Sequence, residues 1–239
     1  MLRGVDSAQV LLQQLPTTLR GLRIAIVTET YPPEVNGVAI TIGRMVAGLR
    51  NRQHQVQLVR PRQHRDDHPA SEPNLEEVLK PGMSIPRYDM LKLGFPAKQA
   101  LIRLWSLKRP DIVHLVTEGP LGWSALVAAL KLKIPVSSDF HTNFHTYSQH
   151  YGIGWLKRPI AAYLRKFHNQ TLCTMVPTES IRSELEQIGL TNLRVVSRGV
   201  DTALFSPRHR SSQLRGRWGA GSGDMVAIYV GRLAPEKNM

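Results

Sequence analysis

Short apolar segments and amphipathic segments alternate along most of this chain, and this alternation is the feature that constrains its fold most. The segment 22–28, LRIAIVT, is apolar, too short for a helix and bounded by a glycine and a proline pair, so we predict a strand there. Apolar residues recur at helical spacing between residues 38 and 49, and a second strand is predicted over 54–61. A strand, a helix and a strand in this order form a right-handed, parallel βαβ unit.

The same alternation continues to about residue 207. The pattern predicts further helices over 97–108, 122–133, 159–171 and 178–188, and further strands over 111–116, 135–139, 173–176 and 192–197. The polar stretch 63–82 is predicted to be a surface insertion. Alternation this regular predicts an α/β fold with a Rossmann-like, doubly wound parallel sheet, although the order of its strands cannot be read from the sequence.

The pattern changes near residue 207. A polar, basic helix is predicted over 211–218, and a strand without partners over 225–230, which is typical of the start of a second domain. We therefore divide the chain into three parts, an N-terminal extension, a Rossmann-like domain and the first segment of a second domain, over residues 1–21, 22–207 and 208–239.

The loops that follow the predicted strands form the expected binding region. Ligands of doubly wound sheets bind outside the carboxyl ends of the strands, so a crevice should be lined by four loops, at 28–37, 116–120, 139–152 and 197–201. Gly37, directly before a predicted helix, would let a phosphate or sugar approach the backbone, although a rigid turn explains this loop equally well. His141 should point into the crevice and either hydrogen-bond a sugar hydroxyl or neutralise a phosphate, unless it is only a satisfied loop histidine.

The net charge of +13 admits several kinds of partner. A basic chain can bind nucleic acid, an anionic membrane surface or an anionic small substrate, or it can simply carry a solvated basic face. We expect no nucleic acid, because only 6% of the residues are aromatic and no recognition module is visible. We also expect no metal: His141, His145 and His150 cluster, but no cysteine or carboxylate pair completes a site with suitable spacing.

The apolar runs and the cysteine count bear on the compartment. No run approaches the roughly 18 residues needed to span a bilayer, no signal peptide is visible, and the single Cys173 suits a reducing cytoplasm. The predicted helix 159–171 and its surroundings carry Lys157, Arg158, Arg165 and Lys166, which could attach the domain peripherally to the inner face of an anionic membrane. The alternative for the apolar stripe of this helix is packing against the sheet.

Arg232 and Lys237 flank a Pro-Glu turn after the last predicted strand. Two cations that reach one point can stabilise a diphosphate leaving group without a metal. Taken alone, the motif is explained more simply as an exposed basic loop.

Six short motifs in sequence order resemble the family 4 retaining glycosyltransferases of GT-B architecture, and the resemblance covers residues 22–239. The motifs are TYPPEVNG (30–37), PDIVH (110–114), FHTN (140–143), PTES (177–180), RGVD (198–201) and YVGRLAPEK (229–237). FHTNF and RGVD are most similar to the subgroup that includes GDP-mannose-dependent mannosyltransferases and lipid glycosyltransferases.

The resemblance implies the N-terminal, acceptor-side half of a GT-B fold. It implies retaining transfer of a sugar, with mannose as one candidate, from a nucleotide-sugar donor such as GDP-mannose to a sugar or glycolipid acceptor. Gly37, Arg232 and Lys237 would bind the donor, and His141 would be the catalytic residue beside the transferred sugar. The acceptor-side crevice would be lined by Asn36, Thr142 and Asn143. Neither a metal, another cofactor nor a protein nucleophile is implied.

The family's downstream acidic motif, which holds the donor sugar and ribose, has no counterpart before residue 239. We therefore expect this chain to be an incomplete part that binds donor weakly and transfers poorly. Two alternatives stay open. One is a non-catalytic module that binds an acceptor or a partner. The other is a sugar-nucleotide epimerase or glucan synthase of the same architecture, although EVNG at 34–37 differs from the Lys-x-Gly-Gly type usual in glucan synthases.

Overall fold

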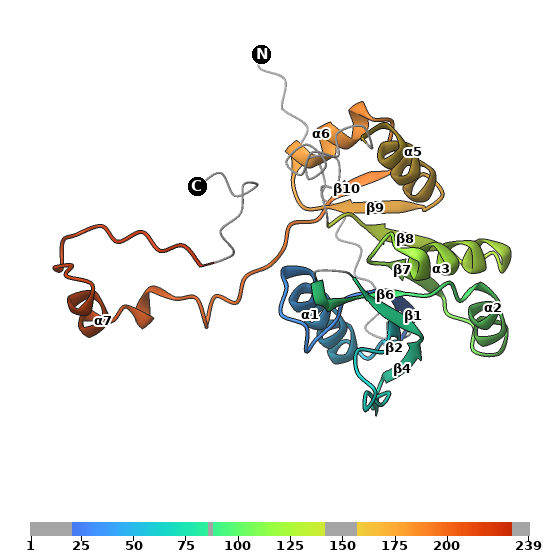
Figure 1. Cartoon of the computed structure of the whole chain (residues 1–239), viewed down its shortest axis with the longest axis horizontal. Coiled ribbons are helices and arrows are strands. Elements are labelled where there is room, and N and C mark those ends of the chain that lie inside the picture. Colours follow the sequence, from blue (N-terminus) through green and yellow to red (C-terminus); the bar gives the residue numbers. More distant parts are fainter. Residues whose placement is uncertain (1–20, 86–87, 142–156, 231–239) are drawn as a thin grey trace, which may run out of the picture.

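The computed structural model describes residues 21–85, 88–141 and 157–230. The strands of its main sheet are β1 (Arg23–Val27), β2 (Gln55–Pro61), β3 (Ser71–Glu72), β4 (Leu75–Lys80), β7 (Ile112–Leu115), β8 (Val136–Asp139), β9 (Cys173–Val176) and β10 (Leu193–Val195). Within the described residues they lie in the order β10-β9-β8-β7-β1-β2-β4-β3, and only β3 and β4 pair antiparallel (Figure 1). The predicted α/β class, a Rossmann-like doubly wound parallel sheet, is confirmed, since the chain moves outward from β1 in both directions.

The side chains of β1 alternate between two layers of core, which explains why this strand is apolar throughout. The helices are α1 (Gly37–Asn51), α2 (Lys98–Leu107), α3 (Pro120–Lys131), α5 (Lys157–His168) and α6 (Glu179–Gln187). Ile24 and Ile26 pack in the cluster that contains α1, whereas Ala25 and Val27 pack with α2 and α3. Because successive side chains of a strand point to opposite faces, β1 is buried from both sides.

The helices and strands predicted between residues 83 and 207 are present, with ends shifted by a few residues. The stretch 63–82 is different, and its prediction as a surface insertion was wrong. It contains β4, which pairs parallel with β2 from Leu75 to Lys80. The polar residues of this stretch misled the prediction because they are paired inside the structure: Arg60 contacts Asp67 at 2.6 Å and Glu77 at 2.9 Å. A two-stranded hairpin follows, made of β5 (Gly82–Ile85) and β6 (Tyr88–Gly94).

The chain beyond β10 leads away from the sheet (Figure 1). A short 3-10 helix, η2 (Pro207–His209), precedes α7 (Ser212–Arg217), which confirms the predicted basic helix. The strand predicted over 225–230 is absent, and that prediction was wrong. Met225 and Val230 are 96% and 90% exposed, and a segment of strand-forming residues needs a neighbouring strand to complete its hydrogen bonds. The domain boundaries stay a prediction.

Glu29 ties three elements together at the centre of the sheet. It is the second residue after β1 and is 8% exposed. Its Oε1 accepts a hydrogen bond from the Leu121 amide at 3.1 Å, in the first turn of α3. The N-cap of that helix is Gly119, which has no side chain to offer, so Glu29 supplies the missing acceptor. A Cβ at Gly119 would lie 1.8 Å from Oε2 of Glu29, so this close approach requires glycine.

Burial raises the pKa of Glu29 to about 7. Hydrogen bonds from the amides of Leu121 and Gly94 oppose this rise in pKa, and the nearby charge of Glu118 adds to it. Desolvation dominates because an ionised carboxylate loses far more hydration than a neutral one. The carboxyl group is therefore divided between its two protonation states near neutral pH.

We expect Glu29→Gln to remove part of the pH dependence of stability. Between the ordinary value of 4.5 and about 7 the folded protein holds a proton that the unfolded chain has released. The contribution of Glu29 therefore favours folding fully at low pH and is lost as pH rises through about 7, which corresponds to on the order of 3 kcal/mol. Urea unfolding at several values across this interval should show the free energy of the wild type falling relative to that of Glu29→Gln.

Glu72→Gln is the matched control, because the Glu72 side chain is 53% exposed. Its unfolding free energy should follow the wild type at each pH. Identical pH slopes for the wild type and Glu29→Gln would contradict the assignment of a raised pKa to Glu29.

Candidate functional site

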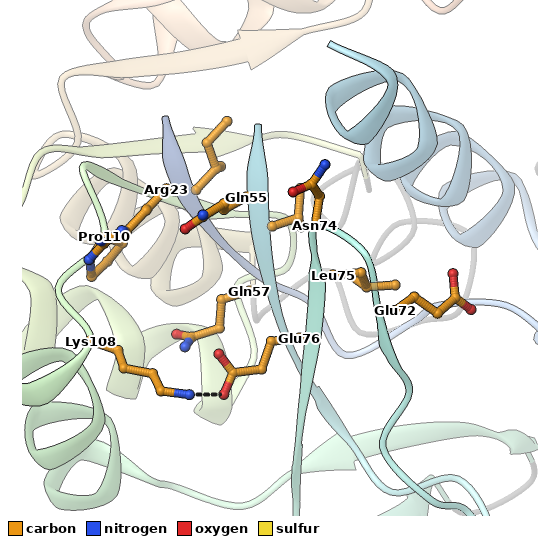
Figure 2. Close-up of a pocket in the computed structure, with 11 residues that line it drawn as sticks. Arg23, Gln55, Gln57, Glu72, Asn74, Leu75, Glu76, Lys108 and Pro110 are labelled. Atoms are coloured by element: carbon orange, nitrogen blue, oxygen red, sulfur yellow. Dashed lines mark hydrogen bonds and ion pairs between the residues drawn. The ribbon is translucent and has the colours of Figure 1, made fainter. Parts of the chain in front are cut away.

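Two pockets lie at opposite edges of the sheet. The pocket at the amino edge has a volume of about 430 Å³ and is formed by the first residues of β1, β2 and β4 together with the end of α2 (Figure 2). Its charged groups are largely paired, as in the 2.8 Å contact between Lys108 and Glu76. Ligands of doubly wound sheets bind at the other edge, so this pocket is not the candidate site.

The second pocket lies at the carboxyl edge, where the loops after the predicted strands were expected to form a crevice. Its volume is about 580 Å³. One wall is α1, which contributes Thr41, Arg44 and Met45. The other walls come from the carboxyl ends of β8, β9 and β10 and the residues after them, namely 139–141, 175–177 and 196–201.

His141 lies at the centre of a chain of polar contacts in this pocket. Its Nε2 is 2.9 Å from Oδ2 of Asp139, and its Nδ1 is 3.0 Å from Nη2 of Arg198. His114 on β7 approaches the same Asp139 oxygen at 3.2 Å, and its other nitrogen lies 3.0 Å from Oγ of Ser137. Both imidazoles are therefore oriented through one carboxylate.

Asp139 is buried, yet its pKa is well below its usual range. Burial alone would raise the pKa of this carboxyl group, but hydrogen bonds from His114 and His141 lower it further than burial raises it. Asp139 is therefore a fixed anion at the end of β8, and it holds the His141 ring in one orientation.

The loop before α1 is stiffened by the side chains of Asn36 and Thr30. Asn36 is the N-cap of α1: its Oδ1 accepts a hydrogen bond from the Ala39 amide at 2.8 Å. Its Nδ2 donates to Oγ1 of Thr30 at 2.7 Å. Thr30 in turn donates to Oε2 of Glu34 at 2.5 Å. Asn36, predicted for the acceptor-side crevice, thus positions the loop that carries Gly37.

A second set of contacts anchors the same loop to the residues after β2. Gln63 is buried and donates from Nε2 to Oε1 of Glu34 at 3.0 Å and to the Tyr31 carbonyl at 2.8 Å. Burial raises the pKa of Glu34, and the hydrogen bonds from Thr30 and Gln63 oppose the rise. The loop is therefore fixed on the sheet through Glu34 and Tyr31, and Gly37 at its end is exposed.

A buried hydrogen-bonded relay, made of Ser138, His168 and Glu118, holds the loop after β7. His168 on α5 is fully buried, with Nδ1 2.9 Å from Oγ of Ser138 and Nε2 3.3 Å from Oε1 of Glu118. Tyr163 donates to the Glu118 carbonyl. Serine, histidine and glutamate here have the order of a hydrolytic triad, but no substrate can reach a serine that is 0% exposed. The relay therefore positions the loop and attaches α5 to it.

The structure brings three of the predicted site residues to one place. His141 lines the pocket, Gly37 is the first residue of α1, and Asn36 caps that helix. The other four, Thr142, Asn143, Arg232 and Lys237, lie outside the described residues. Among the residues that are described, no three histidine, cysteine or carboxylate side chains gather so that they could hold a metal ion.

Arg198 was not singled out from the sequence as a site residue. It belongs to the RGVD motif, which was the available signal, but its contact with His141 joins positions 57 residues apart. Its other amino group, Nη1, lies 3.5 Å from the position that a Cβ of Gly37 would take. One guanidinium thus touches both the helix start and the histidine.

Comparisons with known proteins show which family the chain resembles. Residues 35–204 match the family model described as Glycosyltransferase Family 4. The chain is 31% identical over 226 residues to a GDP-mannose-dependent alpha-mannosyltransferase of Mycobacterium tuberculosis (strain CDC 1551 / Oshkosh), which covers 92% of this chain and 58% of that protein. It is 28% identical over 233 residues to an alpha-monoglucosyldiacylglycerol synthase of Acholeplasma laidlawii, which covers 91% of this chain and 57% of that protein.

A solved structure shares the fold. Sucrose-phosphate synthase from Thermosynechococcus elongatus superimposes with a TM-score of 0.60 at 10% identity, over 84% of this chain and 53% of that one. This likeness confirms the predicted half of a GT-B architecture. The chain spans little more than half the length of the relatives that it matches. Because the family model matches most of its residues, the chain belongs to glycosyltransferase family 4.

Proposed function

We propose that this chain is the acceptor-side part of a retaining glycosyltransferase. The donor is a nucleotide diphosphate sugar, with GDP-mannose as the first candidate, and the acceptor is a sugar or a glycolipid. The observation that carries the proposal is the convergence of Gly37, His141 and Arg198 at the carboxyl edge of the sheet. Relatives whose names state GDP-mannose and a glycolipid product support the choice of donor and acceptor.

In this proposal the described residues have different roles in donor binding and transfer. The Asn36 cap and the Glu34 contacts hold Gly37 where a phosphate or sugar can approach its backbone. Asp139 fixes His141 beside this position, so that its imidazole acts as the catalytic residue next to the transferred sugar. Arg232 and Lys237 would hold the diphosphate, whose developing charge is stabilised by fixed cations without a metal.

Transfer of radiolabelled mannose from GDP-mannose tests the proposal. The longest product of the gene that contains this chain is assayed on vesicles that carry diacylglycerol and glycolipid. We expect a product with retained anomeric configuration, and His141→Ala should lower the rate by about 100-fold or more, because it removes a positioned polar group from the reacting centre.

His54→Ala is the matched control, because His54 lies directly before the amino end of β2 and contacts the Leu22 amide. It should leave the rate unchanged. An inverted product, or a rate that His141→Ala leaves unaltered, would contradict the assignment. Donor binding without any transfer would favour a non-catalytic binding module.

We further propose a peripheral attachment to anionic membrane through the basic surface of α5. No helix in the described part of the chain is long and apolar enough to cross a bilayer. Leu164 and Phe167 of α5 are buried in the core, as the packing alternative predicted, so their apolar side chains are not free to insert. Arg158, Arg165 and Lys166 remain, and each basic residue near anionic lipid contributes on the order of 1 kcal/mol.

Vesicle flotation tests this attachment. We expect the chain to float with vesicles that contain anionic lipid and not with neutral ones, and added salt should release it because the attraction is screened. Arg158→Ala combined with Lys166→Ala should reduce recovery. The same loss of charge on α2, in Lys98→Ala with Arg103→Ala, should not. Equal recovery with both kinds of vesicle would refute the attachment.

A further inference from the structure

Arg198 is a cation without an anionic partner in the described structure. It is exposed, and among the described residues no carboxylate lies within ion-pair distance of it. Its hydrogen-bond partner is His141, which takes one of its two amino groups. A guanidinium carries five N–H donors in a planar fork, so most of the donors of Arg198 have no partner among the described residues.

The surroundings of Arg198 select the class of ligand. Nη1 lies beside Gly37, where the absence of a side chain leaves the backbone open. The first turn of α1 contains no acidic residue that could take the charge. Asp139, the nearest buried carboxylate of the pocket, is already shared by His114 and His141. An oxyanion with several acceptor oxygens, such as a phosphate, matches both the charge and the fork of donors.

The second arginine of the pocket does not share these properties. Hydrogen bonds from the amides of Leu204 and Ala203 lower the pKa of Asp201 in the same pocket, and the positive charge of Arg44 on α1 adds to this lowering. The positive charge of Arg44 is therefore partly balanced within the chain, whereas that of Arg198 is not. The two arginines line one pocket and form a matched pair for substitution.

We propose that Arg198 is a phosphate-binding residue of this half of the enzyme and keeps His141 neutral, with Nδ1 as a hydrogen-bond acceptor. A guanidinium can only donate, so Nδ1 of His141 must carry the lone pair, and the ring proton sits on Nε2 facing Asp139. Arg198 then supplies the positive charge for the phosphate, and the neutral ring of His141 adds no second charge.

The inference rests on the proposed function for the identity of the ligand, a nucleoside diphosphate, and it assigns the recognition of charge to Arg198. Arg232 and Lys237 were predicted to hold the diphosphate from the next segment of the chain. Arg198 would add a further cation, from the residues that follow β10, for the phosphates.

Nuclear magnetic resonance on the 239-residue chain tests the proposal with inorganic diphosphate as the probe. Titration should shift the side-chain nitrogen signals of Arg198, and Arg198→Gln should weaken diphosphate binding by about 10-fold or more. Arg44→Gln should weaken it by less than about 2-fold, because its charge is partly balanced by Asp201. The His141 nitrogen signals of the free chain should report a proton on Nε2 and none on Nδ1.

Several results would overturn the inference. These are no diphosphate-dependent shift at Arg198 up to the solubility limit, equal losses of affinity in Arg198→Gln and Arg44→Gln, or a proton on Nδ1 of His141. Mannose transfer with an Arg198→Gln enzyme whose KM for GDP-mannose is unchanged would refute the role of Arg198 alone. Diphosphate binding at Arg198, combined with no transfer by the longest product of the gene, would refute only the proposed enzymatic activity.

Discussion

The buried carboxyl group of Glu29 fixes the geometry on which the rest of the carboxyl edge depends. It stands where the chain leaves the central strand, and it supplies the acceptor that the first turn of α3 lacks. Because Gly119 leaves room for it, the loops after β1 and β7 approach each other at the point where the doubly wound sheet changes direction. The raised pKa of Glu29 shows that this arrangement is maintained against the cost of desolvating the carboxylate.

Two further hydrogen-bond networks fix the loops at the carboxyl edge of the sheet. Glu34 and Gln63 fix the loop that leads to α1, and the relay of His168 with Glu118 ties α5 to the loop after β7. Beside Gly37, at the start of α1, lies the guanidinium of Arg198, most of whose donors have no hydrogen-bond partner among the described residues. At the amino edge, by contrast, the charged groups are largely paired with one another, as Lys108 is with Glu76. The buried hydrogen-bond networks therefore stabilise the fold, whereas the exposed pocket at the carboxyl edge is available to bind a ligand.

The sequence predicted the alternating elements and the family, because both depend on local patterns. It missed β4, since Glu76 and Glu77 suggest a solvated segment until Arg60 is known to lie beside the strand. It also predicted a strand over residues 225–230 that is absent. These residues have a strand-like composition, but they cannot form a strand without a neighbouring one. The role of Arg198 could not be predicted, because the contact with His141 depends on how β8 and β10 are placed in the sheet. The cap formed by Asn36 has a local signal, since an asparagine directly precedes an apolar helical pattern.

Amide hydrogen exchange of this chain with and without GDP-mannose tests the central claim, that the donor is received at the carboxyl edge of the sheet. Bound donor should slow exchange in the loop 28–37 and in residues 196–201, and leave the amides at the starts of β2 and β4 unchanged. Slowed exchange around Gln55 and Asn74, in the pocket at the amino edge, with no change in the loop before α1, would contradict the account.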